Sequence, residues 1–204
     1  ISTPEKAKIL YIDDEAEKGW NEVLATLLYD INKLDFDSLD IDYKNINQVD
    51  LINQVIKKVK EDDINLVILD FRLISQDFII EEINQITGVK ILKAIKELNP
   101  GIQVIMFSAT NKIWNLQTLQ SEFSDGFIMK ESPENSIDSN FTKNSVLRML
   151  EAITYCIDRI FLKEIFIKLT KVNVQLSAQP YEVDTIYEVL ILNLKSQINI
   201  ITEA

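Results

Sequence analysis

Short apolar runs alternate with amphipathic helices between residues 8 and 130, and this alternation restricts the possible folds more than any other feature of the chain. The run INLVILD over 64–70 is apolar almost throughout, which is typical of a central parallel strand covered on both faces. Five strands alternating with helices predict an α/β fold built on a parallel sheet. Strands are expected over 8–12, 36–44, 64–70, 102–108 and 125–130, and helices over 19–34, 48–61, 87–98 and 114–123.

The pattern changes after residue 140. Residues 142–171 contain no Gly or Pro and could form one helix of 30 residues, about 45 Å long at the usual helical rise. The second half of this segment is too apolar to stand in water alone, and a further helix is expected over 181–201 after Pro180. The two helices could pair as a hairpin, build a dimer, or simply complete the core. We therefore divide the chain into an α/β domain over 1–140 and a helical extension over 141–204.

Composition excludes several classes of function. The net charge of −11 argues against nucleic-acid binding, because phosphate contacts need clustered Lys and Arg. The chain contains no histidine, which excludes histidine-dependent catalysis and histidine metal ligands within these residues. The single cysteine, Cys156, cannot form an intramolecular disulfide and fits a reducing compartment. No apolar run reaches the length of about 18 residues that a membrane helix needs, so a cytoplasmic protein without membrane contact is expected.

Charged and hydroxyl side chains follow four of the predicted strands. Asp13 and Asp14 end the first strand, Asp70 the third, Ser108 the fourth and Lys130 the fifth. The carboxyl ends of parallel strands meet along one edge of an open sheet, so these side chains are expected to converge. Mg²⁺ prefers carboxylate and carbonyl oxygens, while a hydroxyl and an ammonium group suit a phosphoryl group. The sequence therefore predicts a Mg²⁺ and phosphoryl site at this edge.

The segments YIDDE, VILD, VIMFSAT and GFIMK resemble, in that order, the receiver domain of bacterial response regulators. The resemblance extends over about residues 6–170. It implies a doubly wound, flavodoxin-like sheet of five parallel strands in the order 2-1-3-4-5, followed here by a long C-terminal helical extension.

The resemblance also implies a role for each acidic residue. Asp70 corresponds to the phosphoacceptor, whose carboxylate attacks phosphorus to give an acyl phosphate. Asp13 and Asp14 correspond to the Mg²⁺ acids, and Asp70 and the backbone carbonyl of Arg72 are the other expected protein contacts of the ion.

Further residues correspond to the switch and tuning positions of such domains. Ser108 resembles the switch hydroxyl that turns toward the phosphoryl group, and Lys130 resembles the lysine that pairs with this group. Phe127 occupies the position of the rotating aromatic residue. Arg72 and Thr110 occupy positions that influence how fast the phosphoryl group is lost.

The resemblance implies a signalling module rather than a turnover enzyme. The expected phosphoryl donor is a histidine kinase or a histidine phosphotransfer protein. Output is expected through the C-terminal helices, with a possible homodimer through residues 142–201.

The chain departs from the family pattern on both sides of the site. Ile74 stands where a Pro is usual four residues after the phosphoacceptor, and Gly88 lies 18 positions after Asp70. Residues 71–87 therefore contain an insertion of roughly ten residues, compared with the usual short loop. This insertion carries the apolar patch 78–80, which could cover the pocket or contact a partner. The usual Pro after the lysine is replaced by Glu131, so the turn that follows must differ.

Two other functions compete with phosphorylation signalling. A receiver-like scaffold that binds partners without being phosphorylated is favoured by the insertion and by the missing Pro residues. A phosphatase of the haloacid dehalogenase kind would use Asp70 as its nucleophile. That class needs a second Asp two residues later, where this chain has Arg72, so the phosphatase is disfavoured.

Overall fold

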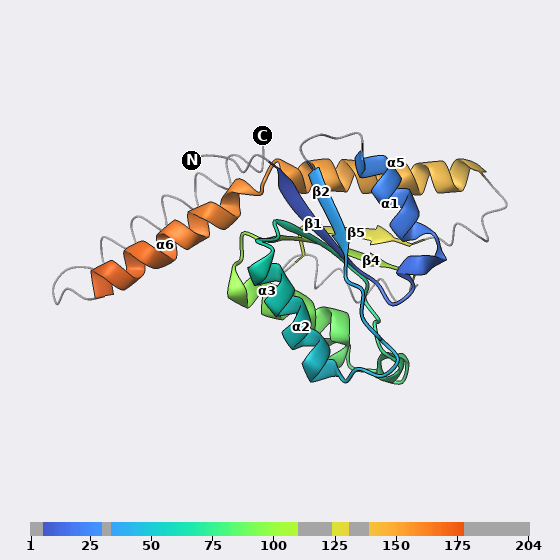
Figure 1. Ribbon diagram of the computed structural model, residues 1–204, viewed down its shortest axis with the longest axis horizontal. Coiled ribbons are helices and arrows are strands. Elements are labelled where there is room, and N and C mark those ends of the chain that lie inside the picture. The colour runs from blue at the N-terminus through green and yellow to red at the C-terminus, as the bar shows by residue number, and fades with distance from the viewer. Residues whose placement is uncertain (1–5, 30–33, 110–123, 131–138, 178–204) are drawn as a thin grey trace. The chain divides into compact units, whose positions relative to one another are not determined.

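The computed structural model describes residues 6–29, 34–109, 124–130 and 139–177 (Figure 1). Its centre is one sheet of five parallel strands. The strands are β1 (Ala7–Ile12), β2 (Leu34–Ser38), β3 (Leu66–Leu69), β4 (Gln103–Ser108) and β5 (Gly126–Met129). Their order across the sheet is β2-β1-β3-β4-β5, and every pair is parallel. The predicted doubly wound, flavodoxin-like α/β fold is therefore confirmed.

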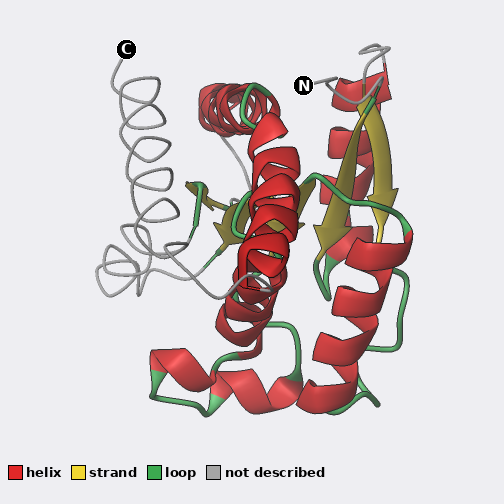
Figure 2. Cartoon of the chain, turned by 90° about the vertical axis from the view of Figure 1, so that its left-hand side faces the viewer, coloured by secondary structure: helices red, strands yellow, loops and turns green. Residues whose placement is uncertain are grey.

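Helices cover both faces of the sheet (Figures 1 and 2). The helices are α1 (Trp20–Tyr29), α2 (Gln48–Glu61), α3 (Thr87–Leu98), α5 (Ser139–Ile157) and α6 (Phe161–Ser177). Buried side chains of α2 and α3 pack on one face, and those of α1 and α5 pack on the other. No helix among the described residues is long and apolar enough to cross a lipid bilayer.

Strand alternation explains how one sheet supplies two cores. Leu10 and Ile12 of β1 face α2 and α3, whereas Ile9 and Tyr11 face α1 and α5. All four residues of β3 are buried, as its continuous apolar sequence predicts for a central strand. The edge strand β2 instead alternates half-buried and exposed residues, because only one of its faces is covered.

Several predicted elements differ in detail from those observed. The second strand ends at Ser38 rather than at residue 44. Residues 71–86, which contain the insertion and for which no helix or strand is predicted, form two 3₁₀ turns, Ser75–Phe78 and Ile83–Gln85. The helices predicted over 114–123 and 181–201 lie outside the described residues.

The predicted long C-terminal segment is helical but interrupted. A turn at residues 158–160 separates α5 from α6, and the N–H groups of Arg159 and Ile160 bond carbonyls three residues back rather than four. The chain forms two compact units, residues 1–164 and 165–204, so α5 belongs to the first unit with the sheet. The prediction of one unbroken helix over 142–171 is therefore wrong at this turn.

Lys163 supplies a physical reason for the interruption. Its buried ammonium group donates to the backbone oxygens of Asp63 at 2.9 Å and of Ile64 at 2.8 Å, and it pairs with the Asp63 carboxylate at 2.6 Å. The Asn99 side chain donates to the Lys163 carbonyl at 3.1 Å. Gly101 lets this backbone approach closely, since a Cβ there would lie 2.4 Å from the Lys163 nitrogen. These contacts fix the start of α6 against the loops that precede β3 and β4.

Replacing Lys163 by Met tests this anchor. The Asp63 and Ile64 carbonyls would lose their donor, so we expect the free energy of unfolding to fall by about 1–3 kcal/mol in urea denaturation. The matched control is Lys168→Met, because Lys168 is exposed on α6. Equal stability of the two variants would contradict the anchoring role.

Candidate functional site

Three carboxylates converge where β1 and β3 end. Asp13 and Asp14 follow β1, and Asp70 follows β3. Because β1 and β3 are neighbouring parallel strands, the three acids lie close together. The Asp70 N–H donates to the Ile12 carbonyl at 2.9 Å, which extends the strand pairing up to the site. One carboxylate oxygen from each acid lies within 4.8 Å of the others. The predicted convergence is therefore present.

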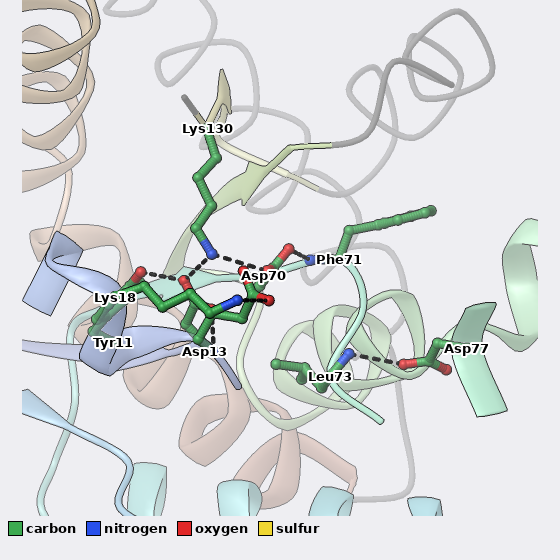
Figure 3. Close-up of polar contacts among 9 residues, drawn as sticks. Tyr11, Asp13, Lys18, Asp70, Phe71, Leu73, Asp77 and Lys130 are labelled. Carbon is green, nitrogen blue, oxygen red and sulfur yellow. Dashed lines mark hydrogen bonds and ion pairs between the residues drawn. The ribbon is translucent and has the colours of Figure 1, made fainter. Parts of the chain in front are cut away.

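Lys130 places a positive charge between two of these acids. It follows β5, and its N–H donates to the Ser108 carbonyl at 2.8 Å. Its ammonium group lies 2.6 Å from Asp13 Oδ2 and 3.4 Å from Asp70 Oδ2 (Figure 3). The Lys130 side chain is only 8% exposed, so water screens these attractions weakly. This lysine therefore joins strands that are 60 and 117 residues away in sequence.

Asp13 has protein partners at both carboxylate oxygens. Oδ2 accepts from the Tyr11 hydroxyl and from Lys130, while Oδ1 accepts from the Glu15 N–H at 2.8 Å. Asp14, by contrast, is exposed. The Asp13 carboxylate is therefore bound by other protein groups, whereas Asp14 and Asp70 line the open pocket.

Burial dominates the electrostatics of the site. It raises the pKa of Asp70 to about 7, with Lys130 opposing the rise and Asp13 adding to it. Partial burial, followed by the charges of Asp13 and Glu15, raises the pKa of Asp14 to about 6. Burial alone would lower the pKa of Lys130, but Asp70 and Asp13 outweigh it and raise this pKa. Asp14 and Asp70 therefore hold protons more tightly than usual, because burial and the neighbouring negative charges both disfavour their ionised forms.

A pocket of about 260 Å³ opens beside these residues. Its walls come from the ends of β1, β3, β4 and β5 and from the segment after Asp70. The lining residues are Asp14, Glu15, Asp70, Arg72, Phe78, Ser108, Ala109 and Lys130. Asp13 is absent from this wall because it lies buried behind it.

The donor set fits a hard divalent cation. Carboxylate oxygens are the ligands that Mg²⁺ prefers, and the ion usually keeps several waters, for which an open pocket leaves room. A cation among Asp13, Asp14 and Asp70 would also oppose the burial and the repulsion that together raise the pKa values of Asp14 and Asp70.

The other predicted site residues fall in three places. Ser108 and Arg72 line the pocket beside Asp70. Phe127 is half-buried and packs against the core on the α2 and α3 side of the sheet. Thr110 lies outside the described residues, as does Glu131 in the turn after Lys130.

Two residues important for the site were missed from sequence, and a third, Gly88, was named only to mark the length of the insertion. Tyr11 is counted among the apolar residues of its strand, yet its hydroxyl donates to Asp13. Asp77 is an acid within a loop, where exposure is the default expectation, yet it is completely buried. Gly88 lies against the backbone after β3, where a Cβ would come within 2.3 Å of the Asp70 carbonyl oxygen. For Asp77 and Gly88, the only feature of the sequence that pointed to this region was the length of the insertion.

A scan against protein-family models found no match, and a search of curated proteins found none either. Among solved structures, the chain is similar to a response regulator receiver domain from Clostridium thermocellum at 20% identity and a TM-score of 0.50. That match covers 76% of this chain and 98% of the other. A signal receiver domain from Vibrio parahaemolyticus matches at 15% identity and a TM-score of 0.50, over 78% of this chain and 96% of the other. The chain therefore has the fold of a response regulator receiver domain.

Proposed function

We propose that this chain is a signalling module that accepts a phosphoryl group on Asp70 in a Mg²⁺-dependent reaction. The observation that carries the proposal is the pairing of buried Lys130 with Asp13 and Asp70 beside an open, acid-lined pocket. A purely structural ion pair would need neither a raised pKa at Asp70 nor a further carboxyl group, that of Asp14, with a raised pKa at the pocket wall.

The proposed chemistry is nucleophilic. An Asp70 carboxylate oxygen attacks the phosphorus of a phosphohistidine, the P–N bond breaks, and the imidazole leaves with a proton from solvent. Asp70 is then an acyl phosphate. Positioning and charge neutralisation supply most of the catalysis in such a transfer, because the protein provides little other covalent chemistry.

Mg²⁺ would be held by Asp14 and Asp70, with the Arg72 backbone carbonyl as a further ligand. When bound, the ion neutralises negative charge on the phosphoryl oxygens. Asp13 would act mainly as a fixed negative charge near the ion, because its own oxygens already accept from Tyr11, Lys130 and the Glu15 N–H.

Lys130 and Ser108 would bind the phosphoryl oxygens once Asp70 is modified. Lys130 already lies 3.4 Å from Asp70 Oδ2, so a small movement toward the new group suffices. The Tyr11 hydroxyl would stay on Asp13 and continue to stabilise its charge as the lysine moves. Phe127 would respond to Ser108 as a switch, and Arg72 and Thr110 would tune the loss of the phosphoryl group.

The expected donor is a histidine kinase or phosphotransfer protein in the cytoplasm, and the module would not turn over a separate substrate. We propose that the signal leaves through the C-terminal helices, by changing self-association through residues 142–201. The anchor at Lys163 supports this route, because it ties the start of α6 to the loop that precedes β3, the strand that ends at Asp70.

A second candidate is a receiver-like scaffold that binds partners without phosphorylation. The exposed apolar side chains of Phe78 and Ile79 in the insertion favour it, since a partner could cover them. Partner binding that is unchanged in Asp70→Ala would support this reading.

Phosphoryl transfer is tested with acetyl phosphate and Mg²⁺. We expect intact-mass measurement to show the addition of one phosphoryl group to the wild type and none to Asp70→Asn. Asp35→Asn is the matched control, because it removes one exposed carboxylate from the edge strand β2. An unmodified wild type, with acetyl phosphate and also with a phosphorylated histidine donor, would contradict the proposal.

Because burial raises the pKa of Asp70, we expect its ionisation to destabilise the metal-free protein at neutral pH. Its pKa of about 7 in the folded chain exceeds the ordinary value of 3.8, so the folded state binds the proton more tightly. The free energy of unfolding should therefore fall as pH rises between about 4 and 7, and stay lower above that range. The Asp70→Asn variant should not lose stability in this way, because the amide of an Asn side chain does not ionise.

Thermal unfolding in a chelator measures the difference. Asp70→Asn should be more stable than the wild type by on the order of 1 kcal/mol at about pH 8, with the gap closing near pH 4. Asp35→Asn should show no comparable gain. A wild type as stable as Asp70→Asn at the higher pH would show that ionisation of Asp70 does not destabilise the folded chain.

A further inference from the structure

The insertion after Asp70 is held together by a completely buried carboxylate. Asp77 Oδ2 accepts from the Leu73 N–H at 2.9 Å (Figure 3). The same oxygen accepts from the Ile74 N–H at 3.3 Å. Its Oδ1 accepts from the N–H of Thr87 at 2.9 Å and from the Thr87 hydroxyl at 2.7 Å. One side chain therefore binds both ends of the insertion. No cation pairs with Asp77 among the described residues, so these four donors alone compensate its buried charge.

The far end of the insertion is also fixed to the backbone of the site. The Gly88 N–H donates to the Phe71 carbonyl at 3.2 Å, and a Cβ at Gly88 would collide with the Asp70 carbonyl oxygen. The start of α3 thus lies directly against the residue that follows the acceptor. The insertion is therefore a closed loop with both ends held beside Asp70.

Phe78 follows the buried acid and reaches the pocket. It lines the pocket together with Asp70 and Arg72, although 62% of it is exposed. The Arg72 guanidinium carbon lies 5.4 Å from the centre of the Phe78 ring, a cation–π arrangement. Arg72 Nε is buried and has no hydrogen-bond partner among the described residues, so contact with the ring is its principal described interaction. Ile79, the next residue, is 83% exposed and does not line the pocket.

We infer that Phe78, positioned by Arg72 and by the Asp77 loop, limits the access of water to the phosphoryl group on Asp70 and so lengthens the life of the phosphorylated state. The inference rests on the proposed function, because it concerns the fate of the aspartyl phosphate. Phe78 lies at the rim of the pocket, and Arg72 acts on water access only by holding the Phe78 ring in place.

The chemistry of hydrolysis explains why the rim matters. A water oxygen must attack phosphorus roughly in line with the bond to the Asp70 oxygen. The P–O bond to Asp70 then breaks, giving free aspartate and inorganic phosphate, and the water protons pass to phosphate and solvent. The Asp70 side of this line is filled by β1 and by the start of α3, so the water must approach from the open pocket. An aromatic ring on that wall excludes part of the solvent that could attack.

The test compares Phe78→Ala with Ile79→Ala, two truncations of neighbouring exposed apolar residues. Each protein is phosphorylated with acetyl phosphate and Mg²⁺, the donor is removed, and the loss of the adduct is followed by intact mass. We expect Phe78→Ala to lose the phosphoryl group at least about 3-fold faster than the wild type. Ile79→Ala should match the wild type, and Phe78→Trp should be no faster.

The role of the loop is tested separately with Thr87→Val. This change removes one of the four donors to Asp77 and should also shorten the adduct lifetime, by less than Phe78→Ala. Hydrogen exchange at the Leu73 and Ile74 amides should be faster in Thr87→Val and unchanged in Phe78→Ala. That pair of readouts separates a loosened loop from a lost ring.

The outcomes distinguish this inference from the proposed function. Adduct that forms and decays equally in the wild type and Phe78→Ala would overturn the rim role alone. Equal acceleration in Phe78→Ala and Ile79→Ala would also overturn it, because the effect would then belong to the loop surface in general. A wild type that forms no adduct would overturn the proposed function, and the rim role with it.

Discussion

The contact of the Lys130 ammonium with Asp13 and Asp70 is the interaction on which the site depends. It joins residues that follow three different strands, at 2.6 Å and 3.4 Å, in a setting where the lysine is nearly buried. Removing the positive charge would leave carboxylates facing one another across a few ångströms with little water to separate them. The parallel sheet makes this contact possible, because it aligns the carboxyl ends of β1, β3 and β5 along one edge.

The two acids beside Lys130 are held differently, and this difference gives them different tasks. Asp13 is bound by Tyr11, by Lys130 and by the Glu15 N–H, so its carboxylate is held in place. Asp70 has a weaker contact with the lysine and a pKa raised to about 7, so it gains most from a cation or a phosphoryl group that draws Lys130 closer. Phosphorylation would therefore move the lysine from one acid toward the other while Tyr11 stays with Asp13.

Strand alternation was enough to predict a parallel sheet, and the resemblance to receiver domains supplied the strand order. The carboxyl ends of parallel strands share one edge of the sheet, so the residues at those ends predicted the convergence of Asp13, Asp14, Asp70 and Lys130. Asp77 escaped prediction because its donors lie up to ten residues away, where no local pattern reveals them. Tyr11 lies only two residues from Asp13, but its hydroxyl was overlooked because the residue is counted among the apolar residues of its strand. The turn at 158–160 contains no Gly or Pro, and it follows from the tertiary contacts of Lys163 instead.

A crystal structure of the chain with Mg²⁺ and beryllofluoride tests whether Asp70 and Lys130 bind a phosphoryl group together. We expect beryllium bonded to an Asp70 oxygen and a metal ion on Asp14 and Asp70. We also expect Lys130 in contact with fluoride, while the Tyr11 hydroxyl stays on Asp13. An unmodified Asp70 with Lys130 still bound to Asp13, at saturating Mg²⁺ and beryllofluoride, would contradict this joint binding.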